Sequence, residues 1–171
     1  MTEADNLFIT HRLQVFRYLS RIVGQIDARE LTQEVFLRVA RGPVPERDAA
    51  GTRAWVFHIA RNLALNHVRD DCRRGEVVGL PERGAPATQE LSAALAQALG
   101  QLPDLDRDVF LMRESGGLNY EEIARACDLT VDAVRSRLHR ARLRLRETLG
   151  ERVRAGYTVG VNLYEKPGTT E

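Results

Sequence analysis

The chain has 171 residues, 43% of them hydrophobic, which fits one medium domain or two small ones and excludes wholesale disorder. Its first residues lack the basic start and apolar block of a secretory signal, and no run approaches the roughly 18–20 apolar residues of a membrane span. We therefore expect a cytoplasmic protein without membrane contact of its own. Cys72 and Cys127 are far apart in the sequence, so we expect neither a disulfide nor a metal site from them.

The net charge of +1 conceals two basic segments on either side of an acidic one. Residues 51–74 carry five arginines against two aspartates, and residues 131–146 carry six arginines against one aspartate. Residues 75–130, in contrast, carry four arginines against ten acidic residues. Two separate phosphate-facing surfaces are the simplest interpretation. A solvated helix can carry a similar charge run, and because Lys166 is the only lysine, abundant arginine alone is weak evidence.

Apolar residues recur with helical spacing along most of the chain, and the pattern stops where Gly and Pro gather. In the second predicted helix Leu31, Val35 and Val39 lie four residues apart on one face, which Phe36 widens. Before residue 119, the predicted helices cover residues 7–23, 28–40, 53–73, 91–102 and 104–114. The side chains of the third helix that we expect to face inward are Trp55, Ile59, Leu63 and Val68.

The fold class that this pattern predicts is all-α, with two small helical domains joined by a flexible linker. The linker is placed at residues 75–90, which have no periodicity and contain much Gly and Pro. The N-terminal domain then covers residues 1–74 and the C-terminal domain residues 91–149. A tail of residues 150–171 remains, in which apolar residues alternate briefly, although its polar end favours disorder.

Residues 119–146 have the pattern of a helix-turn-helix. Asn119 and Glu122 have the spacing of a capping box, and Asn is a good N-cap residue. Residues 128–130 form the predicted turn, in which Thr130 caps the following helix. That helix has one apolar stripe, made by Val134, Leu138, Ala141 and Leu145, opposite a basic face.

The basic face of this helix has the composition of a DNA-recognition helix. A major groove admits one helix, and its base edges offer hydrogen-bond acceptors to arginine. The first turns carry the side chains that we expect to meet bases, Arg135, Ser136, His139 and Arg140. Arg137, Arg142 and Arg144 lie at the flanks and are expected to contact phosphates. An ordinary helical hairpin with a charged face is the alternative, but the coincidence of capped helices, short turn and basic face favours DNA binding.

Three collinear segments resemble bacterial RNA polymerase sigma factors. Residues 27–39, DARELTQEVFLRV, resemble the D-A-x-D/E-L-x-Q-E-x-F segment of that family. Residues 53–66, RAWVFHIARNLALN, look like its promoter-melting helix, and the segments within 102–142 match its C-terminal domain. The order of these segments resembles the extracytoplasmic-function (ECF) group of the sigma-70 family, which keeps only these two domains. The resemblance covers about residues 7–149.

The resemblance implies that core RNA polymerase is a partner. In the family, the segment that matches residues 27–39 contacts the clamp helices of the largest subunit, and the flap of the second-largest subunit is a further contact. The residues expected to bind the core polymerase are Asp27, Glu30, Leu31, Gln33, Glu34, Leu37 and Arg38. On the sequence alone, this acidic and amide-bearing face could equally be solvated surface. The family also implies an anti-sigma factor that wraps around the two domains or wedges between them.

The resemblance further implies that the −10 promoter element is opened and one nontemplate base is held outside the stack. This requires a stacking surface and hydrogen bonds to the base edge. The expected −10 contacts are Trp55, Phe57, His58, Arg61, Asn62, Asn66 and Arg69, with residues 47–52 as a specificity loop. For Trp55, a position in the core is at least as compatible with the sequence as a DNA contact.

The sequence departs from the family pattern at two positions of the recognition helix. Ala133 stands where the family often has Thr, which removes one phosphate contact. His139 occupies a variable base-reading position, so the −35 sequence cannot be predicted.

Two classes of function remain. The first is a sigma factor that binds core polymerase, recognises −35 and −10 elements and helps to melt promoter DNA. The second is a free-standing helix-turn-helix regulator that binds an operator duplex as a dimer. The histidines are dispersed, and the chain contains neither metal-ligand spacing nor a phosphate-binding glycine motif, so we expect no enzymatic activity, cofactor or metal.

Overall fold

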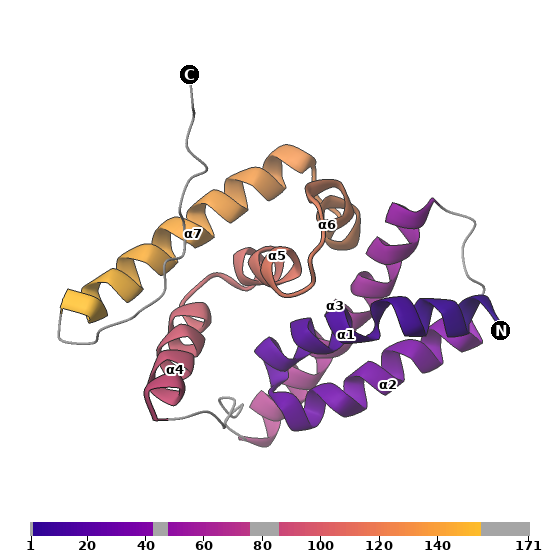
Figure 1. The fold of residues 1–171 in the computed structure, drawn as a ribbon, viewed down its shortest axis with the longest axis horizontal. Coiled ribbons are helices and arrows are strands. Elements are labelled where there is room, and N and C mark those ends of the chain that lie inside the picture. Colours follow the sequence, from indigo (N-terminus) through magenta and orange to yellow (C-terminus); the bar gives the residue numbers. More distant parts are fainter. Residues whose placement is uncertain (1, 43–47, 76–85, 155–171) are drawn as a thin grey trace.

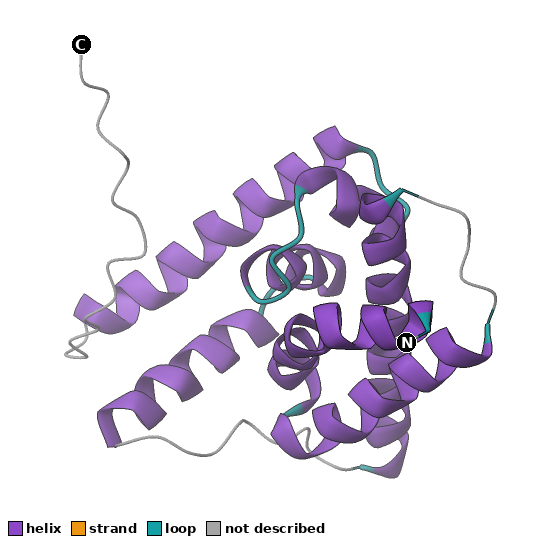
Figure 2. Cartoon of the chain, turned by 45° about the vertical axis from the view of Figure 1, so that its right-hand side comes forward, coloured by secondary structure: helices purple, strands orange, loops and turns teal. Residues whose placement is uncertain are grey.

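The computed structural model describes residues 2–42, 48–75 and 86–154, and within these ranges every regular element is a helix (Figure 1, Figure 2). The prediction of an all-α fold is therefore confirmed. Most of the expected linker and the alternating segment of the tail lie outside the described residues. The helices are α1 (Glu3–Val23), α2 (Gln25–Arg41), α3 (Ala49–Arg74), α4 (Pro86–Gly100), α5 (Asp104–Glu114), α6 (Tyr120–Cys127) and α7 (Val131–Arg154).

Several helices extend beyond the apolar periodicity that predicted them. The first begins at Glu3 because Thr2 and Asp5 form a capping box, with Asp5 N–H donating to Thr2 Oγ1. Asp48 caps α3 by accepting from the Gly51 N–H at 2.9 Å, so residues 49–52 of the expected specificity loop are helical. Helix α4 begins inside the expected linker, at a proline, which is well tolerated in a first helical turn.

The N-terminal bundle consists of α1, α2 and α3, as predicted (Figure 1). The stripe expected on α2 is confirmed, since Val35 and Val39 are fully buried. On α3 the prediction was partly wrong. All four predicted side chains face the core, since Leu63 is buried and Trp55, Ile59 and Val68 are partly buried and packed against it. The prediction was wrong in leaving out Val56 and Phe57, which are fully buried.

The helix-turn-helix forms as its sequence predicts. Asn119 Oδ1 accepts from the Glu122 N–H, and Glu122 Oε2 accepts from the Asn119 N–H, both at 2.8 Å. Thr130 Oγ1 caps α7 by accepting from the Ala133 N–H at 3.2 Å. Asp128 closes α6 in the left-handed conformation, with φ 54°, which short polar residues tolerate. The predicted apolar stripe of α7 is buried throughout.

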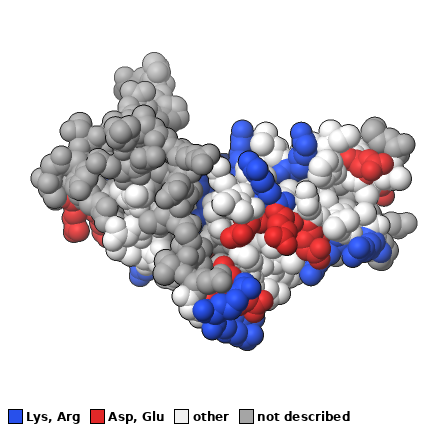
Figure 3. Space-filling view, turned by 90° about the horizontal axis from the view of Figure 1, so that it is seen from below, with Lys and Arg blue, Asp and Glu red and all other residues white. Residues whose placement is uncertain are grey.

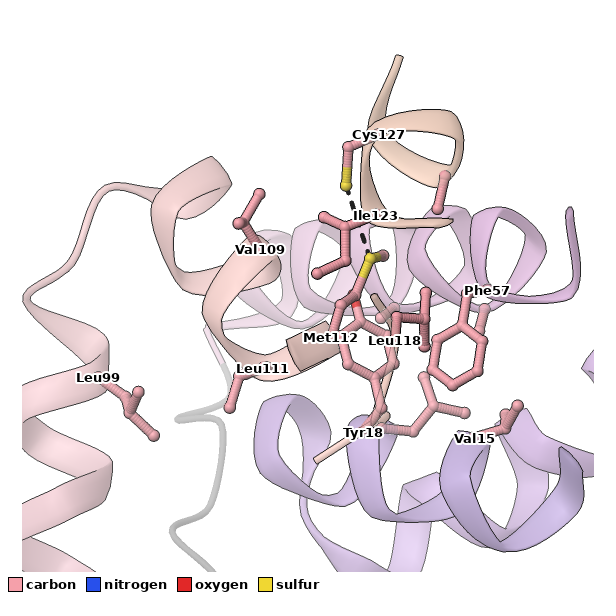
Figure 4. Packing of buried hydrophobic residues seen from close by; sticks show 14 of the residues in the cluster. Val15, Tyr18, Phe57, Leu99, Val109, Leu111, Met112, Leu118, Ile123 and Cys127 are labelled. Atoms are coloured by element: carbon pink, nitrogen blue, oxygen red, sulfur yellow. Dashed lines mark hydrogen bonds between the residues drawn. The ribbon is translucent and has the colours of Figure 1, made fainter. Parts of the chain in front are cut away.

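The two bundles share one apolar core. Helix α3 packs along α6, and α1 touches α5. Figure 4 shows Tyr18 and Phe57 of the N-terminal bundle meeting Met112 and Leu118 of the C-terminal bundle, all of them fully buried. The sequence predicts the two helical groups, but it does not reveal this extensive packing between them.

The capping box of α6 generates a stability prediction. Asn119→Ala removes the acceptor for the Glu122 N–H, and we expect the free energy of unfolding to fall by about 1 kcal/mol. Asn119→Ser retains a hydroxyl acceptor and should restore most of the loss. Urea denaturation followed by circular dichroism measures both variants. An Asn119→Ala midpoint equal to that of the unchanged protein would show that the cap is not needed.

Candidate nucleic-acid interface

The exposed face of α7 presents the side chains that the sequence assigns to base reading. Arg135, Ser136 and His139 are exposed, and the Arg140 side chain is 51% exposed. Arg144 is exposed as well. Because the opposite stripe of the helix is buried, these side chains project together from one side of a rigid element. Leu143, 43% exposed, is an apolar exception on a face that the sequence predicted to be wholly polar.

Two acidic residues of α5 form ion pairs with three of the predicted DNA-binding arginines. The carboxylate of Asp106, itself only 2% exposed, accepts from Arg137 at 2.7 Å and lies 3.5 Å from Arg140 Nε. Arg142 pairs with Glu114 at 3.1 Å. These pairs fix the arginines beside the recognition face, and a phosphate would have to compete with the carboxylates for them. The sequence did not reveal Asp106, which looks there like an ordinary first-turn acid of α5.

The predicted −10 residues divide into an exposed group and a covered group. Asn66 and Arg69 are exposed, and Trp55 is partly buried against the core. Phe57, in contrast, has no exposed surface, and its ring meets Tyr18 edge-on at a centroid distance of 5.7 Å. The remaining three side chains, His58, Arg61 and Asn62, take part in polar contacts at the boundary between the two bundles.

A hydrogen-bonded chain runs from α3 to the end of α6. His58 Nδ1 lies 2.9 Å from the Ala126 carbonyl oxygen, which can only accept, so Nδ1 carries the proton. The Asn62 amide lies 3.0 Å from His58 Nε2 and donates to it when the imidazole is neutral. These hydrogen bonds therefore engage His58, whose imidazole the sequence assigns to DNA. They also engage Asn62, one of the two amides, with Asn66, that the sequence assigns to DNA.

A buried ion pair joins α3 to α5. Arg61 Nε lies 2.9 Å from Asp108 Oδ2, and the Asp108 side chain is 3% exposed. Burial raises the pKa of the Asp108 carboxyl, and the neighbouring guanidinium acts against this rise. Burial also disfavours the charged form of Arg61, but the carboxylate outweighs it and raises the pKa of the guanidinium. We give more weight to the pairing because the contact is short and direct, so both groups are charged at neutral pH.

Two further arginines span the same boundary. Arg53 of α3 donates to the Gly116 carbonyl at 2.8 Å and lies 3.5 Å from Glu122 of the capping box. Arg125 of α6 donates to Asp48, the N-cap residue of α3, at 2.7 Å. Neither arginine was singled out from the sequence, because nothing in the spacing of residues 48 and 125 or 53 and 116 indicates that they meet.

The face of α2 that the sequence assigns to core polymerase is largely accessible. Glu30, Gln33 and Leu37 are exposed, Arg38 pairs with Glu34 at 2.8 Å, and Leu31 is partly buried against the core. Asp27 lies 3.3 Å from His67 of α3, which lies 3.2 Å from Asp71. The possible ligand atoms of these last three residues lie within 4.8 Å of one another, a grouping that the sequence did not show.

On the face shown in Figure 3, acidic side chains lie between basic groups. None of the described helices combines the length and apolar character needed to cross a membrane.

Comparison with known families agrees with this arrangement. Residues 7–74 match the family model described as Sigma-70 region 2, and residues 92–145 match Sigma-70, region 4. Both halves are thus sigma-70 regions, a region 2 followed by a region 4. The chain belongs to the ECF group of RNA polymerase sigma factors, which are transcription initiation factors.

Individual relatives show the extent of the similarity. The ECF RNA polymerase sigma factor SigL of Mycobacterium tuberculosis is 34% identical over 157 residues, which cover 85% of this chain and 88% of SigL. SigE of Mycolicibacterium smegmatis is 36% identical over 166 residues and 88% of this chain, although the chain spans only 63% of SigE. The ECF sigma-E factor of Escherichia coli is 29% identical, over 80% of this chain and 81% of that factor.

Solved structures share the fold. The sigma factor RpoE of Bartonella quintana, crystallised with the anti-sigma factor NepR, has a TM-score of 0.66 at 20% identity, over 85% of this chain and 96% of that one. CnrH, in complex with the cytosolic domain of CnrY, has the same TM-score at 23% identity, over 86% of this chain and 88% of that one.

The two cysteines should differ sharply in reactivity. Burial raises the pKa of the Cys127 thiol to about 12, and this thiol donates to the Met112 sulfur at 3.6 Å, as the dashed line in Figure 4 shows. Cys72 is exposed. Since the thiolate is the nucleophile, we expect an aromatic disulfide reagent at pH 8 to modify Cys127 at least about a hundredfold more slowly than Cys72. Cys72→Ser isolates the slow phase, and a fast reaction in that variant would contradict the burial of Cys127.

Proposed function

We propose that this protein binds core RNA polymerase through α2, reads the −35 element through α7 and contacts the opened −10 element through α3. It acts in the cytoplasm as a transcription initiation factor and has no catalytic activity of its own. The observation that carries the proposal is the capped helix-turn-helix, whose α7 exposes Arg135, Ser136, His139 and Arg140 on one side, within a chain that has both sigma-70 regions.

The −35 assignment depends on the chemistry of the exposed face. Arg135 and Arg140 can donate two hydrogen bonds each to the acceptors of a guanine in the major groove, and Ser136 and His139 can pair with several base edges. Arg137 and Arg142 are half-buried beside carboxylates and are suited to phosphates at the edge of the groove.

Core polymerase is proposed to dock on the outer face of α2. Glu30 and Gln33 offer polar acceptors, and Leu37, 47% exposed, offers an apolar contact beside them. A mixed surface of this kind suits a protein partner better than DNA, whose phosphates would repel the carboxylates. The flap of the second-largest polymerase subunit is the proposed partner of the C-terminal domain.

An anti-sigma factor is the proposed negative regulator. Two structural neighbours, RpoE of Bartonella quintana and CnrH, were solved with such partners, and the shared fold makes the same class of partner reasonable for this chain. The expected arrangement remains a protein that wraps around the two domains or wedges between them.

The proposed domain boundaries stay at residues 1–74, 91–149 and 150–171. Helix α4 begins before the second of these ranges, and α7 ends after it.

The alternative, a free-standing dimeric regulator, accounts for α7 but leaves region 2 without a role. It would bind operator duplex tightly without polymerase, at half-sites about one helical turn apart. A sigma factor should bind duplex weakly alone and gain affinity with core enzyme.

Run-off transcription with core polymerase and a library of genomic fragments tests the proposal. We expect promoter-dependent transcripts, and we expect Arg140→Ala to lower them by about tenfold or more because a base-reading hydrogen bond is lost. Core binding, measured separately by native gel, should be unchanged. Arg146→Ala removes an equal charge from an exposed position of the same helix and serves as the control.

Two results would contradict the proposal. The first is tight duplex binding alone with no transcript from any fragment. The second is an equal loss of transcription and core binding in Arg140→Ala.

A further inference from the structure

We infer that Asp106 is a positioning residue for −35 recognition. Its carboxylate orients the guanidinium of Arg140 toward one base, and it raises the selectivity of the protein while lowering the affinity for DNA in general. The inference rests on the proposed function of α7 as the −35 reader. It adds a residue outside α7, in the first turn of α5, to those that determine which sequence is read.

Both oxygens of the Asp106 carboxylate are directed to α7. Oδ1 accepts from Arg137 Nη1 at 2.7 Å, and Oδ2 accepts from Arg140 Nε at 3.5 Å. The two arginines are three residues apart, so they lie on one side of the helix. A buried carboxylate is costly without charged or hydrogen-bonding partners, and Asp106 is only 2% exposed. The contacts with α7, rather than solvent, therefore satisfy this acid.

The two arginines are held to different degrees. Arg137 makes the short contact, and its side chain is 28% exposed, so it anchors the carboxylate. Arg140 makes the longer contact and is 51% exposed. The carboxylate thus gives Arg140 a preferred direction while leaving half of its side chain accessible to DNA. The pair of Arg135 with Asp132 is different, because both side chains are largely exposed and the contact is screened by solvent.

The atom through which Arg140 is held determines how it can meet a base. Nε faces Asp106, so the donors that remain for DNA belong to the two Nη groups at the end of the side chain. A guanidinium can donate from these two groups to the N7 and O6 acceptors of one guanine. A planar fork that is oriented before binding loses less side-chain entropy in this contact and fits fewer alternative acceptors. We therefore expect Arg140 to read a guanine and Asp106 to strengthen that preference.

The same carboxylate opposes binding that does not depend on sequence. Phosphate contacts made by cationic side chains supply nearly all of the non-specific affinity for DNA. Asp106 engages two such cations, Arg137 and Arg140, and a phosphate has to compete with it for both. Loss of the carboxylate should therefore have opposite effects, with tighter non-specific binding and weaker base selectivity. A residue that only stabilises the fold would lower both when it is lost.

Non-specific binding is measured with the full chain and a random-sequence duplex, by fluorescence anisotropy over a series of salt concentrations. We expect Asp106→Asn to bind about threefold more tightly than Asp104→Asn at low salt, with a salt dependence steeper by about one phosphate contact. Asp104→Asn is the matched control, because it removes the same charge from the same helical turn at a side chain that is 80% exposed. Equal or weaker binding by Asp106→Asn would overturn the inference.

Selectivity is measured by sequencing the run-off transcripts that the holoenzyme makes from the genomic fragments. Alignment of the upstream DNA gives the base preference at each position of the −35 element. We expect Asp106→Asn to reduce a guanine preference at one position by about tenfold and to keep the others, whereas Asp104→Asn keeps all of them. Arg140→Ala should lose the same preference and so identifies the position.

The two proposals fail in different ways. Normal transcripts with an unaltered base preference in Asp106→Asn would contradict the role of Asp106 and leave the sigma-factor function standing. No transcript from the unchanged protein would contradict the sigma-factor function itself, while the comparison of the two variants on duplex would still decide whether Asp106 restrains the arginines.

A measurement on the unchanged protein keeps the inference testable if Asp106→Asn does not fold. Heteronuclear NMR follows hydrogen exchange at the Nε–H groups of individual arginines. We expect the Arg140 Nε–H to exchange at least about threefold more slowly than that of Arg135, because Arg135 donates to its exposed partner Asp132 through Nη1 instead. Equal exchange rates would show that Asp106 does not orient Arg140, and would overturn the inference.

Discussion

The packing between the two helical groups requires a close approach of the backbone at Gly116 to the ring of Phe57. A side chain at residue 116 would meet both this ring and the Met112 carbonyl at 2.7 Å. Because the loop has no side chain at this point, α3 can lie along α6, and the two helical groups bury one continuous core. The positions of His58, Arg61 and Arg53 against the C-terminal domain all follow from this packing.

Two buried carboxylates of α5 connect this packing to both of the proposed DNA-binding surfaces. Asp106 and Asp108 are two residues apart, so their side chains point roughly 200° away from each other around the helix. Asp106 pairs with Arg137 of the proposed recognition helix α7, and Asp108 pairs with Arg61 of α3, the proposed melting helix. These two acids engage three guanidinium groups, those of Arg61, Arg137 and Arg140, for which a phosphate would have to compete.

Much of the fold could be predicted from the sequence, because it is encoded locally. The stripes of α2 and α7, and the caps at Asn119 and Thr130, depend on residues within one or two helical turns. The contact between α3 and the C-terminal domain joins residues more than forty positions apart, and neither periodicity nor spacing carries such information. Phe57 shows the consequence, since its aromatic ring suggests a stacking surface in the sequence but lies fully buried in the fold.

The account's central claim is that α3 packs against the C-terminal domain, with Phe57 buried between the two helical groups. Hydroxyl-radical footprinting, read by mass spectrometry as the oxidation of Phe57 relative to Trp55, measures this most directly. We expect Phe57 to be protected in the free chain, whereas Trp55, which is only partly buried, becomes oxidised. Oxidation of Phe57 in the free chain as rapid as that of Trp55 would contradict the claim.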